Sequence, residues 1–216
     1  MSAYFWLELT GMLLGLTVGL CLKMPSLPVG HKRQVYLAGV LGLIIGMKLP
    51  VLLTYPWSQD LILNGKTYMG GILGAFLAIN LYKHWAKQTP QSFGGRWAIP
   101  LAIAAGFGKI GCYLNGCCGG HFFIPLQLVE SAFQFTMAIS LYVFYKKTER
   151  MDLLFPVYLL GYLGMRFIVE FGREEPRILG PFTIYHLLAM IFIPYLIYLI
   201  RQRLYAKSSF LNLLSA

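Results

Sequence analysis

Charged residues are scarce in this chain. Of its 216 residues, only 12% are Asp, Glu, Lys or Arg, whereas 57% are hydrophobic. Soluble globular domains carry about 25% charged residues, so the composition excludes a water-soluble globular protein. The hydrophobic residues are gathered into long runs, each close to the roughly 20 residues that a membrane-spanning helix needs.

Seven such runs follow one another along the chain. They are Tyr4–Leu22, Gln34–Thr54, Tyr68–Tyr82, Trp97–Gly116, Pro125–Tyr145, Leu153–Phe171 and Phe182–Ile200. They use most of the sequence and leave no room for a soluble domain. We therefore expect one all-α domain over residues 1–216, an integral membrane protein of seven transmembrane helices. The first run lacks a basic leading region and a small-residue cleavage pattern, so we expect a span rather than a signal peptide.

Acidic residues are rarer than basic ones, with 8 Asp and Glu against 18 Lys and Arg. The basic residues gather in every second loop and after the last run, as the positive-inside rule requires. This pattern predicts that the amino terminus lies outside and the carboxyl terminus in the cytoplasm. Because topology accounts for the excess positive charge, no nucleic-acid partner is implied.

Cysteine is also scarce, and four cysteines form no disulfide framework. Three of them precede a histidine in the pattern C-x4-C-C-x2-H, made of Cys112, Cys117, Cys118 and His121. These four side chains could in principle bind a zinc ion. The spacing matches no usual zinc knuckle, however, and adjacent cysteines rarely bind one metal well. We therefore expect small buried thiols or a disulfide, with no metal and no cofactor.

Six ionisable residues fall within the apolar runs. They are Glu8, Lys48, Lys109, Glu130, Arg166 and Glu170. Each costs about 2.5–3.5 kcal/mol at the centre of a membrane helix, so they should face the protein interior and have partners. Three are basic and three acidic, which fits either structural ion pairs or a polar site for a ligand.

The sixth run ends in GMRFIVEFGREEP, where charged residues recur at helical spacing. Arg166, Glu170 and Arg173 are spaced i, i+4 and i+7, which predicts one stripe of a helix. Glu170 could hold either arginine in position, and a fixed guanidinium suits a phosphate group.

The fifth run places Gln127, Glu130 and Gln134 on one helical face. Interhelical hydrogen bonding and ligand binding explain this pattern equally well.

Residues 106–120, GFGKIGCYLNGCCGG, end the fourth run. Lys109 lies on the helix, and Asn115 and Gly116 follow at its end. We expect Gly106 and Gly108 to allow close helix packing. Beyond Gly116 the chain should leave the helix, and irregular backbone at membrane depth occurs where it is buried in protein or lines a cavity. Glycine-rich turns also expose amides that can bind an anion.

Segments of the chain, in order, resemble motifs of the bacterial prolipoprotein diacylglyceryl transferase family. They are GMKLP (46–50), TYMGGILGA (67–75), GKIGCYLNGCCGG (108–120), IPLQLVESA (124–132), RFIVEFGREEP (166–176) and FTIYHLLAM (182–190). The segment 166–176 is similar to the family pattern R-F-x-x-E-F-x-R-x-P. The segment 108–120 resembles G-R-I-G-N-F-x-N-G-E-x-x-G, or a related form with G-C-F-x-x-G-C-C-Y-G.

The resemblance implies an enzyme of the bacterial plasma (inner) membrane, with several membrane passes, that takes part in lipoprotein biosynthesis. It would move the diacylglyceryl group of phosphatidylglycerol to the lipobox cysteine thiol of a prolipoprotein. Its partners would therefore be this phospholipid and the prolipoprotein signal peptide. The alternatives are a non-catalytic lipid-binding or transport relative, and a paralogue with another lipid donor or acceptor. A thiol oxidoreductase or metal-dependent enzyme built on the cysteines is a third class.

The resemblance also implies roles for individual residues. The expected substrate-binding residues are Lys48, Lys109, Asn115, Gly116, Gln127, Glu130 and Arg173, and the expected catalytic residues are Arg166, Glu170, His121 and His186. Lys48 and Lys109 stand where the family has arginines. The family histidine of the third span is Met69 here, and the glutamate of the fourth-span motif is Cys117. A proton would then have to move through His186, His121 or Glu170.

Overall fold

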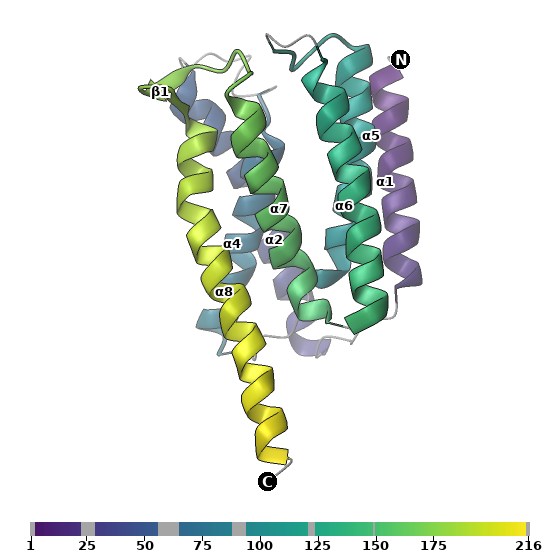
Figure 1. Cartoon of the computed structure of the whole chain (residues 1–216), viewed down its shortest axis with the longest axis vertical. Coiled ribbons are helices and arrows are strands. Elements are labelled where there is room, and N and C mark those ends of the chain that lie inside the picture. The colour runs from purple at the N-terminus through teal and green to yellow at the C-terminus, as the bar shows by residue number, and fades with distance from the viewer. Residues whose placement is uncertain are drawn as a thin grey trace. The chain divides into compact units, whose positions relative to one another are not determined.

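The computed structural model describes residues 3–22, 29–55, 65–87, 94–120, 124–148 and 150–214. Within these ranges the chain forms seven helices and one short β-hairpin (Figure 1). The helices are α1 (Ala3–Cys21), α2 (Val29–Thr54), α4 (Tyr68–Trp85), α5 (Gly95–Leu114), α6 (Leu126–Thr148), α7 (Met151–Glu170) and α8 (Ile184–Leu214). Each coincides with one of the predicted apolar runs, so the all-α prediction is confirmed.

Among the described residues, five helical segments are long and apolar enough to cross a membrane. They are Arg33–Thr54, Gly95–Leu114, Leu126–Thr148, Met151–Glu170 and Ile184–Tyr205. Within α1, Phe5–Cys21 is a shorter apolar helix. Many large apolar side chains on these helices are exposed, for example Leu41, Ile45, Ile139 and Ile191. Exposed apolar side chains on long helices are stable in lipid, so the chain is a membrane protein with several passes.

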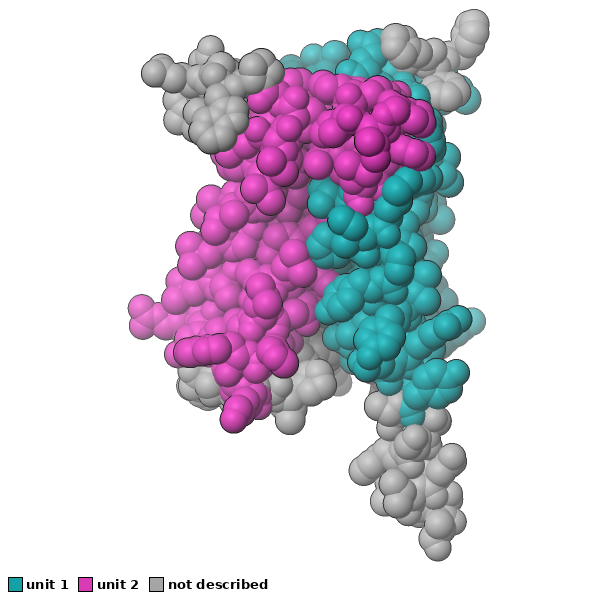
Figure 2. Space-filling model, turned by 90° about the vertical axis from the view of Figure 1, so that its left-hand side faces the viewer, with its two compact units in different colours: residues 1–24, 92–174, 188–216 teal, residues 25–91, 175–187 magenta. Residues whose placement is uncertain are grey.

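The residues group into two compact units, coloured separately in Figure 2. One unit comprises residues 1–24, 92–174 and 188–216, and the other comprises residues 25–91 and 175–187. The boundary between them passes through the start of α8.

In the second unit, α2 and α4 are joined through glycines. A Cβ atom on Gly42 or Gly46 of α2 would collide with the backbone of α4, and one on Gly70 or Gly74 would collide with α2. Glycine at these positions therefore lets the two backbones meet directly, which is how membrane helices gain packing energy. The neighbouring Met69 side chain is buried.

In the first unit, α5 packs against α1, α6 and α7. Gly106 faces the edge of the Phe135 ring, and its carbonyl accepts a hydrogen bond of 2.9 Å from the Ser131 hydroxyl of α6. The packing role predicted for Gly106 is thus confirmed. The same prediction for Gly108 is wrong, because no described atom lies within 4 Å of a Cβ built there.

The last two helices differ from their predicted bounds, most of all α8, which continues to Leu214 beyond the predicted end at Ile200. Helix α7 ends at Glu170, so Arg173 lies in the turn beyond it and not on the helical stripe. A two-stranded antiparallel hairpin, β1 (Arg177–Leu179) and β2 (Phe182–Thr183), precedes α8. The predicted helix start at Phe182 is therefore two residues early. Gly180, with φ of 58°, supplies the left-handed residue that the tight turn of the hairpin requires.

Candidate functional site

A buried carboxylate on α6 contacts positively charged side chains from three segments of the first unit. Glu130 is fully buried, and one of its oxygens lies 2.6 Å from the ammonium of Lys109 on α5. Its other oxygen lies 3.4 Å from the Arg166 guanidinium on α7 and accepts a short hydrogen bond from Arg173. One carboxylate therefore fixes cations from α5, α7 and the turn that follows α7.

A second buried carboxylate orients the cation of α7. Glu170 lies one turn after Arg166, and its oxygen is 2.8 Å from the guanidinium. The prediction that Glu170 could hold either arginine is confirmed for Arg166. The structure pairs Arg173 with Glu130 instead, because Arg173 has left the helix.

The five side chains form one group, which we call the Glu130 cluster: Lys109, Glu130, Arg166, Glu170 and Arg173. Three of these side chains are cationic and two are anionic, so the five together carry one excess positive charge. Buried charge in a low-dielectric interior is costly. A singly charged anion, such as a phosphodiester, would neutralise the cluster.

Arg173, in the turn beyond α7, stays positively charged. Burial alone would lower the pKa of Arg173, but the charge of Glu130 and its hydrogen bond outweigh burial and raise that pKa above its ordinary value. Arg173 is therefore a permanent positive charge, only 4% exposed, at the end of the membrane helix.

The two glutamines on the buried face of α6 have different contacts. The Gln134 side-chain oxygen accepts a hydrogen bond of 3.3 Å from the Tyr158 hydroxyl on α7. This bond confirms interhelical hydrogen bonding for Gln134. The Gln127 amide donates to the carbonyl of Cys117 at 2.9 Å, so it holds the turn that follows α5.

That turn lies beside the segment that carries Arg173. Gly120 forms an isolated antiparallel bridge with Arg173, and a Cβ on Gly120 would collide with the carbonyl of Gly172. Asn115 and Gly116 are exposed at the start of the turn, outside the Glu130 cluster, and Asn115 caps α5 through its backbone amide. Gly116 adopts φ of 66°, which ends the helix.

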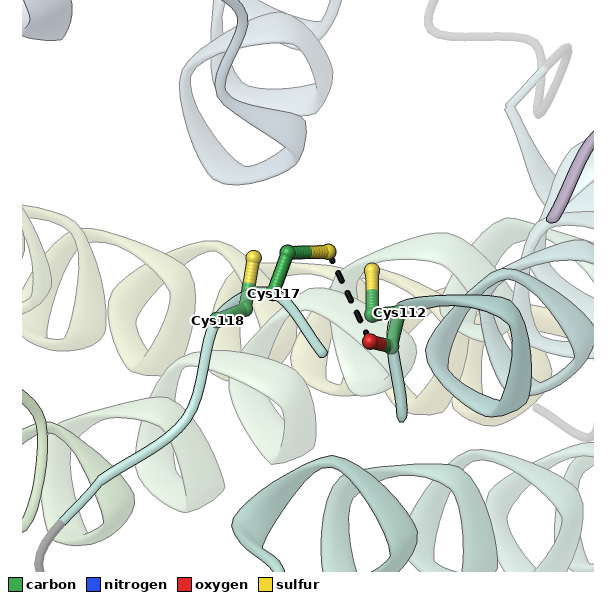
Figure 3. Close-up of side chains that lie close together, drawn as sticks. All are labelled: Cys112, Cys117 and Cys118. Atoms are coloured by element: carbon green, nitrogen blue, oxygen red, sulfur yellow. Dashed lines mark hydrogen bonds between the residues drawn. The ribbon is translucent and has the colours of Figure 1, made fainter. Parts of the chain in front are cut away.

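Three thiols converge on the same turn. The sulfur atoms of Cys112, Cys117 and Cys118 all lie within 4.8 Å of one another, and Figure 3 shows the three side chains pointing to one side. The hydrogen bond from Cys112 and the positive charges of Lys109 and Arg173 lower the pKa of the Cys118 thiol, although partial burial opposes this shift.

The remaining candidates belong to the second unit or fall outside the described residues. Lys48 lies half-buried on α2. His186 is fully buried at the start of α8, where its Nδ1 accepts the Thr183 backbone N–H at 3.1 Å. His121 lies outside the described residues. Thr183, which orients the histidine ring, was not singled out from the sequence.

A family model for prolipoprotein diacylglyceryl transferases matches residues 3–201, which is most of the chain. The chain belongs to the prolipoprotein diacylglyceryl transferase family. The family prediction made from the short motifs is therefore confirmed.

Individual relatives agree with this family assignment. A protein of Clostridium tetani named phosphatidylglycerol–prolipoprotein diacylglyceryl transferase is 29% identical over 178 residues, which are 68% of this chain and 70% of that protein. A numbered second transferase of the same name from Clostridium perfringens is 30% identical over 134 residues, or 53% of this chain and 52% of the relative. The transferase of Photobacterium profundum is 29% identical over 171 residues, covering 67% and 64% of the two proteins. The chain thus spans between 52% and 70% of the length of these relatives.

The structure adds two features that the diacylglyceryl transferase motifs did not indicate. The first is that Arg173 and Glu130, 43 residues apart in sequence, form a direct contact. The second is that the cysteines converge, because adjacent positions such as Cys117 and Cys118 ordinarily point apart. The short spacing of C-x4-C-C was the available signal for the second feature. No sequence pattern indicated the first.

Proposed function

We propose that this protein transfers the diacylglyceryl group of phosphatidylglycerol to the lipobox cysteine thiol of a prolipoprotein. The observation that carries the proposal is the Glu130 cluster, with its buried excess positive charge. A phosphatidylglycerol headgroup carries a single negative charge on its phosphodiester. The headgroup and the cluster therefore match in sign and in magnitude.

The reaction forms one bond and breaks one bond. The sulfur of the acceptor thiolate attacks the glyceryl carbon that carries the phosphate ester, and a thioether forms. The carbon–oxygen bond to phosphate breaks, and its electron pair leaves with glycerol phosphate. Negative charge grows on the phosphate oxygens in the transition state, so cations fixed beforehand at those oxygens lower the barrier.

Each residue of the Glu130 cluster has a role in this scheme. Lys109, Arg166 and Arg173 bind the phosphate oxygens, and the two arginines can offer paired N–H donors. Glu130 and Glu170 are positioning residues, because their carboxylates hold the cations in place before the lipid arrives. Gln127 supports the adjoining turn through the Cys117 carbonyl.

His186 is held by Thr183. Its Nδ1 lies 3.1 Å from both the backbone nitrogen and the hydroxyl of Thr183, and the ring is fully buried. We therefore assign His186 a positioning role. Lys48, Asn115, Gly116 and His121 remain candidates for lipid or peptide contacts.

The membrane arrangement completes the proposal. All seven helices would span the plasma (inner) membrane of a bacterium, as one domain over residues 1–216, with the amino terminus outside and the carboxyl terminus in the cytoplasm. The alternation of basic loops supports this orientation. In it, the turn after α5 and the turn after α7 both face the outer leaflet, where secreted precursors emerge.

The test uses purified protein in detergent with phosphatidylglycerol and a synthetic lipobox peptide. We expect the peptide to gain the mass of one diacylglyceryl group while an equal amount of glycerol phosphate is released. The variants Lys109→Met and Arg166→Ala should lose turnover. Lys146→Met, which removes an exposed lysine at the end of α6, is the matched control and should keep it. Full turnover by Lys109→Met or Arg166→Ala would refute the phosphate-binding role.

The second candidate is a lipid-binding relative without chemistry. It is favoured by Met69, a buried side chain that cannot move a proton, at the position of the family histidine. This candidate predicts that phosphatidylglycerol co-purifies with the protein but that no glycerol phosphate is released. A transferase with another lipid donor or acceptor would instead be active on a different lipid or thiol in the same assay.

A further inference from the structure

We propose that Cys112, Cys117 and Cys118 form a three-thiolate site for a thiophilic d10 cation, Zn²⁺, whose fourth coordination position receives the acceptor thiol. The second half of this inference rests on the proposed transferase function. The zinc site itself concerns only residues of this chain and does not depend on the transferase function.

The positions of the three sulfur atoms support the proposed metal site. In tetrahedral coordination, Zn–S bonds of about 2.3 Å place neighbouring sulfurs about 3.8 Å apart. The three sulfurs lie within 4.8 Å of one another, which is close to the spacing that the site requires. A disulfide would use only two of these thiols and would leave the convergence of the third unexplained.

The backbone explains how adjacent cysteines reach one point. The Cys117 amide donates to the carbonyl of Cys112 at 3.0 Å, which closes a loop back onto the end of α5. Cys118 then adopts φ of 60°, a left-handed conformation that is uncommon for residues other than glycine. Such a conformation costs free energy and persists where the surroundings hold it in place. Its effect is that Cys117 and Cys118 point to the same side (Figure 3).

The surroundings suit the charge of the site. Three thiolates with Zn²⁺ carry a net charge of minus one, and the turn is bridged to the segment that carries the cation Arg173. Gln127 holds the Cys117 carbonyl, and Gly120 joins the turn to Arg173. Soft thiolate ligands select Zn²⁺ or Cu⁺ over hard cations such as Mg²⁺.

Three protein ligands leave one coordination position for a substrate, as in catalytic zinc sites. Cys118 is exposed and its two neighbours are half-buried, so the site is accessible from one side. A thiol that binds Zn²⁺ is deprotonated, and its proton passes to solvent. The bound sulfur would then attack the glyceryl carbon. The S–C bond would form as the Zn–S bond and the carbon–oxygen bond to phosphate break, glycerol phosphate would leave with the electron pair of the carbon–oxygen bond, and the zinc would stay on the three cysteines. This route supplies a thiolate in a chain that has Met69 in place of the family histidine.

The first experiment measures metal content. Protein carrying no metal-binding tag is purified in detergent, equilibrated with Zn²⁺, dialysed against metal-free buffer and analysed by plasma mass spectrometry. We expect one zinc ion per chain, with loss of that zinc in Cys112→Ser, Cys117→Ser and Cys118→Ser. Cys21→Ser, which removes the exposed cysteine at the end of α1, is the matched control and should keep its zinc. Folded protein without zinc, or with a disulfide between two of the three cysteines, would overturn the metal site.

The second experiment tests the fourth position. Protein loaded with Co²⁺ should show thiolate-to-cobalt charge transfer, and its visible spectrum should change when the lipobox peptide binds through sulfur. The same peptide with serine in place of cysteine is the control and should leave the spectrum unchanged. An unchanged spectrum with the cysteine peptide would overturn the role of the fourth position.

The outcomes separate this inference from the proposed function. Full turnover by zinc-free protein would support the transferase and overturn the role of the fourth coordination position. Bound zinc and a spectral response to the cysteine peptide, without glycerol phosphate release, would support the metal site and overturn the transferase.

Discussion

Replacement of Glu130 by glutamine isolates the electrostatic role of the central carboxylate. Glutamine keeps the size and shape of the side chain but removes its negative charge. The carboxylate contacts Lys109 at 2.6 Å, Arg166 at 3.4 Å and Arg173 by a short hydrogen bond. In the variant, Glu170 is the one carboxylate left in the Glu130 cluster, so the excess charge of the cluster rises from one positive charge to two.

The expected loss of stability follows from this change of charge. Removing one partner of a buried ion pair costs about 3–5 kcal/mol, because the other charge stays buried without compensation. For a protein of this size, about 1 kcal/mol corresponds to roughly 2–4 °C in Tm. We therefore expect Glu130→Gln to lower the apparent Tm in detergent by roughly 6–20 °C, measured at one fixed scan rate.

Two further variants serve as controls. Gln134→Leu lies one turn along the same face of α6 and loses only the hydrogen bond from Tyr158, so it should cost about 1 kcal/mol. Adding Lys109→Met to Glu130→Gln returns the excess charge to one, and the double variant should recover part of the lost stability. A Tm for Glu130→Gln within about 2 °C of the parent protein would refute the reasoning.

The remaining predictions concern glycines, and each has a matched partner. Gly74→Ala should lower the Tm in detergent, because the added Cβ would collide with the backbone of α2, whereas Gly71→Ala has a nearest neighbour at 3.5 Å and should be neutral or slightly stabilising. Equal Tm values for this pair would contradict direct backbone contact. Gly120→Ala should push the cysteine turn away from the turn after α7 and reduce both turnover and zinc content, whereas Gly119→Ala, with its nearest neighbour at 3.7 Å, should preserve them. Full turnover and zinc content in Gly120→Ala would show that the bridge does not support the site.

The sequence by itself determined the helices and the family. A membrane helix must satisfy its backbone hydrogen bonds within its own segment, so each apolar run defines its element without reference to distant residues. For this reason the predicted runs coincide with the seven helices of the described residues. The errors at Arg173 and Phe182 both fall at helix ends, where capping and turns decide the boundary.

The partners of the buried charges were decided only by the tertiary structure. The spacing of Arg166 and Glu170 predicted their pairing, because both lie on one helix. It could not predict that Arg173 contacts Glu130, since this contact depends on how α6 and α7 are rotated about their axes and on where α7 ends. Periodicity gives the buried face of a helix but not the residue that faces it.

In the turn that holds Cys112, Cys117 and Cys118, the sequence also could not predict which side chains meet, although these residues are close in sequence. The sequence places three thiols within seven residues, and in a regular helix or strand the adjacent pair would point in different directions. A left-handed residue at Cys118 and a loop closed onto the carbonyl of Cys112 bring all three to one point. The sequence therefore determined which chemical groups this protein contains, and the tertiary structure decided which of them meet, because contacts between segments depend on backbone paths that no local pattern encodes.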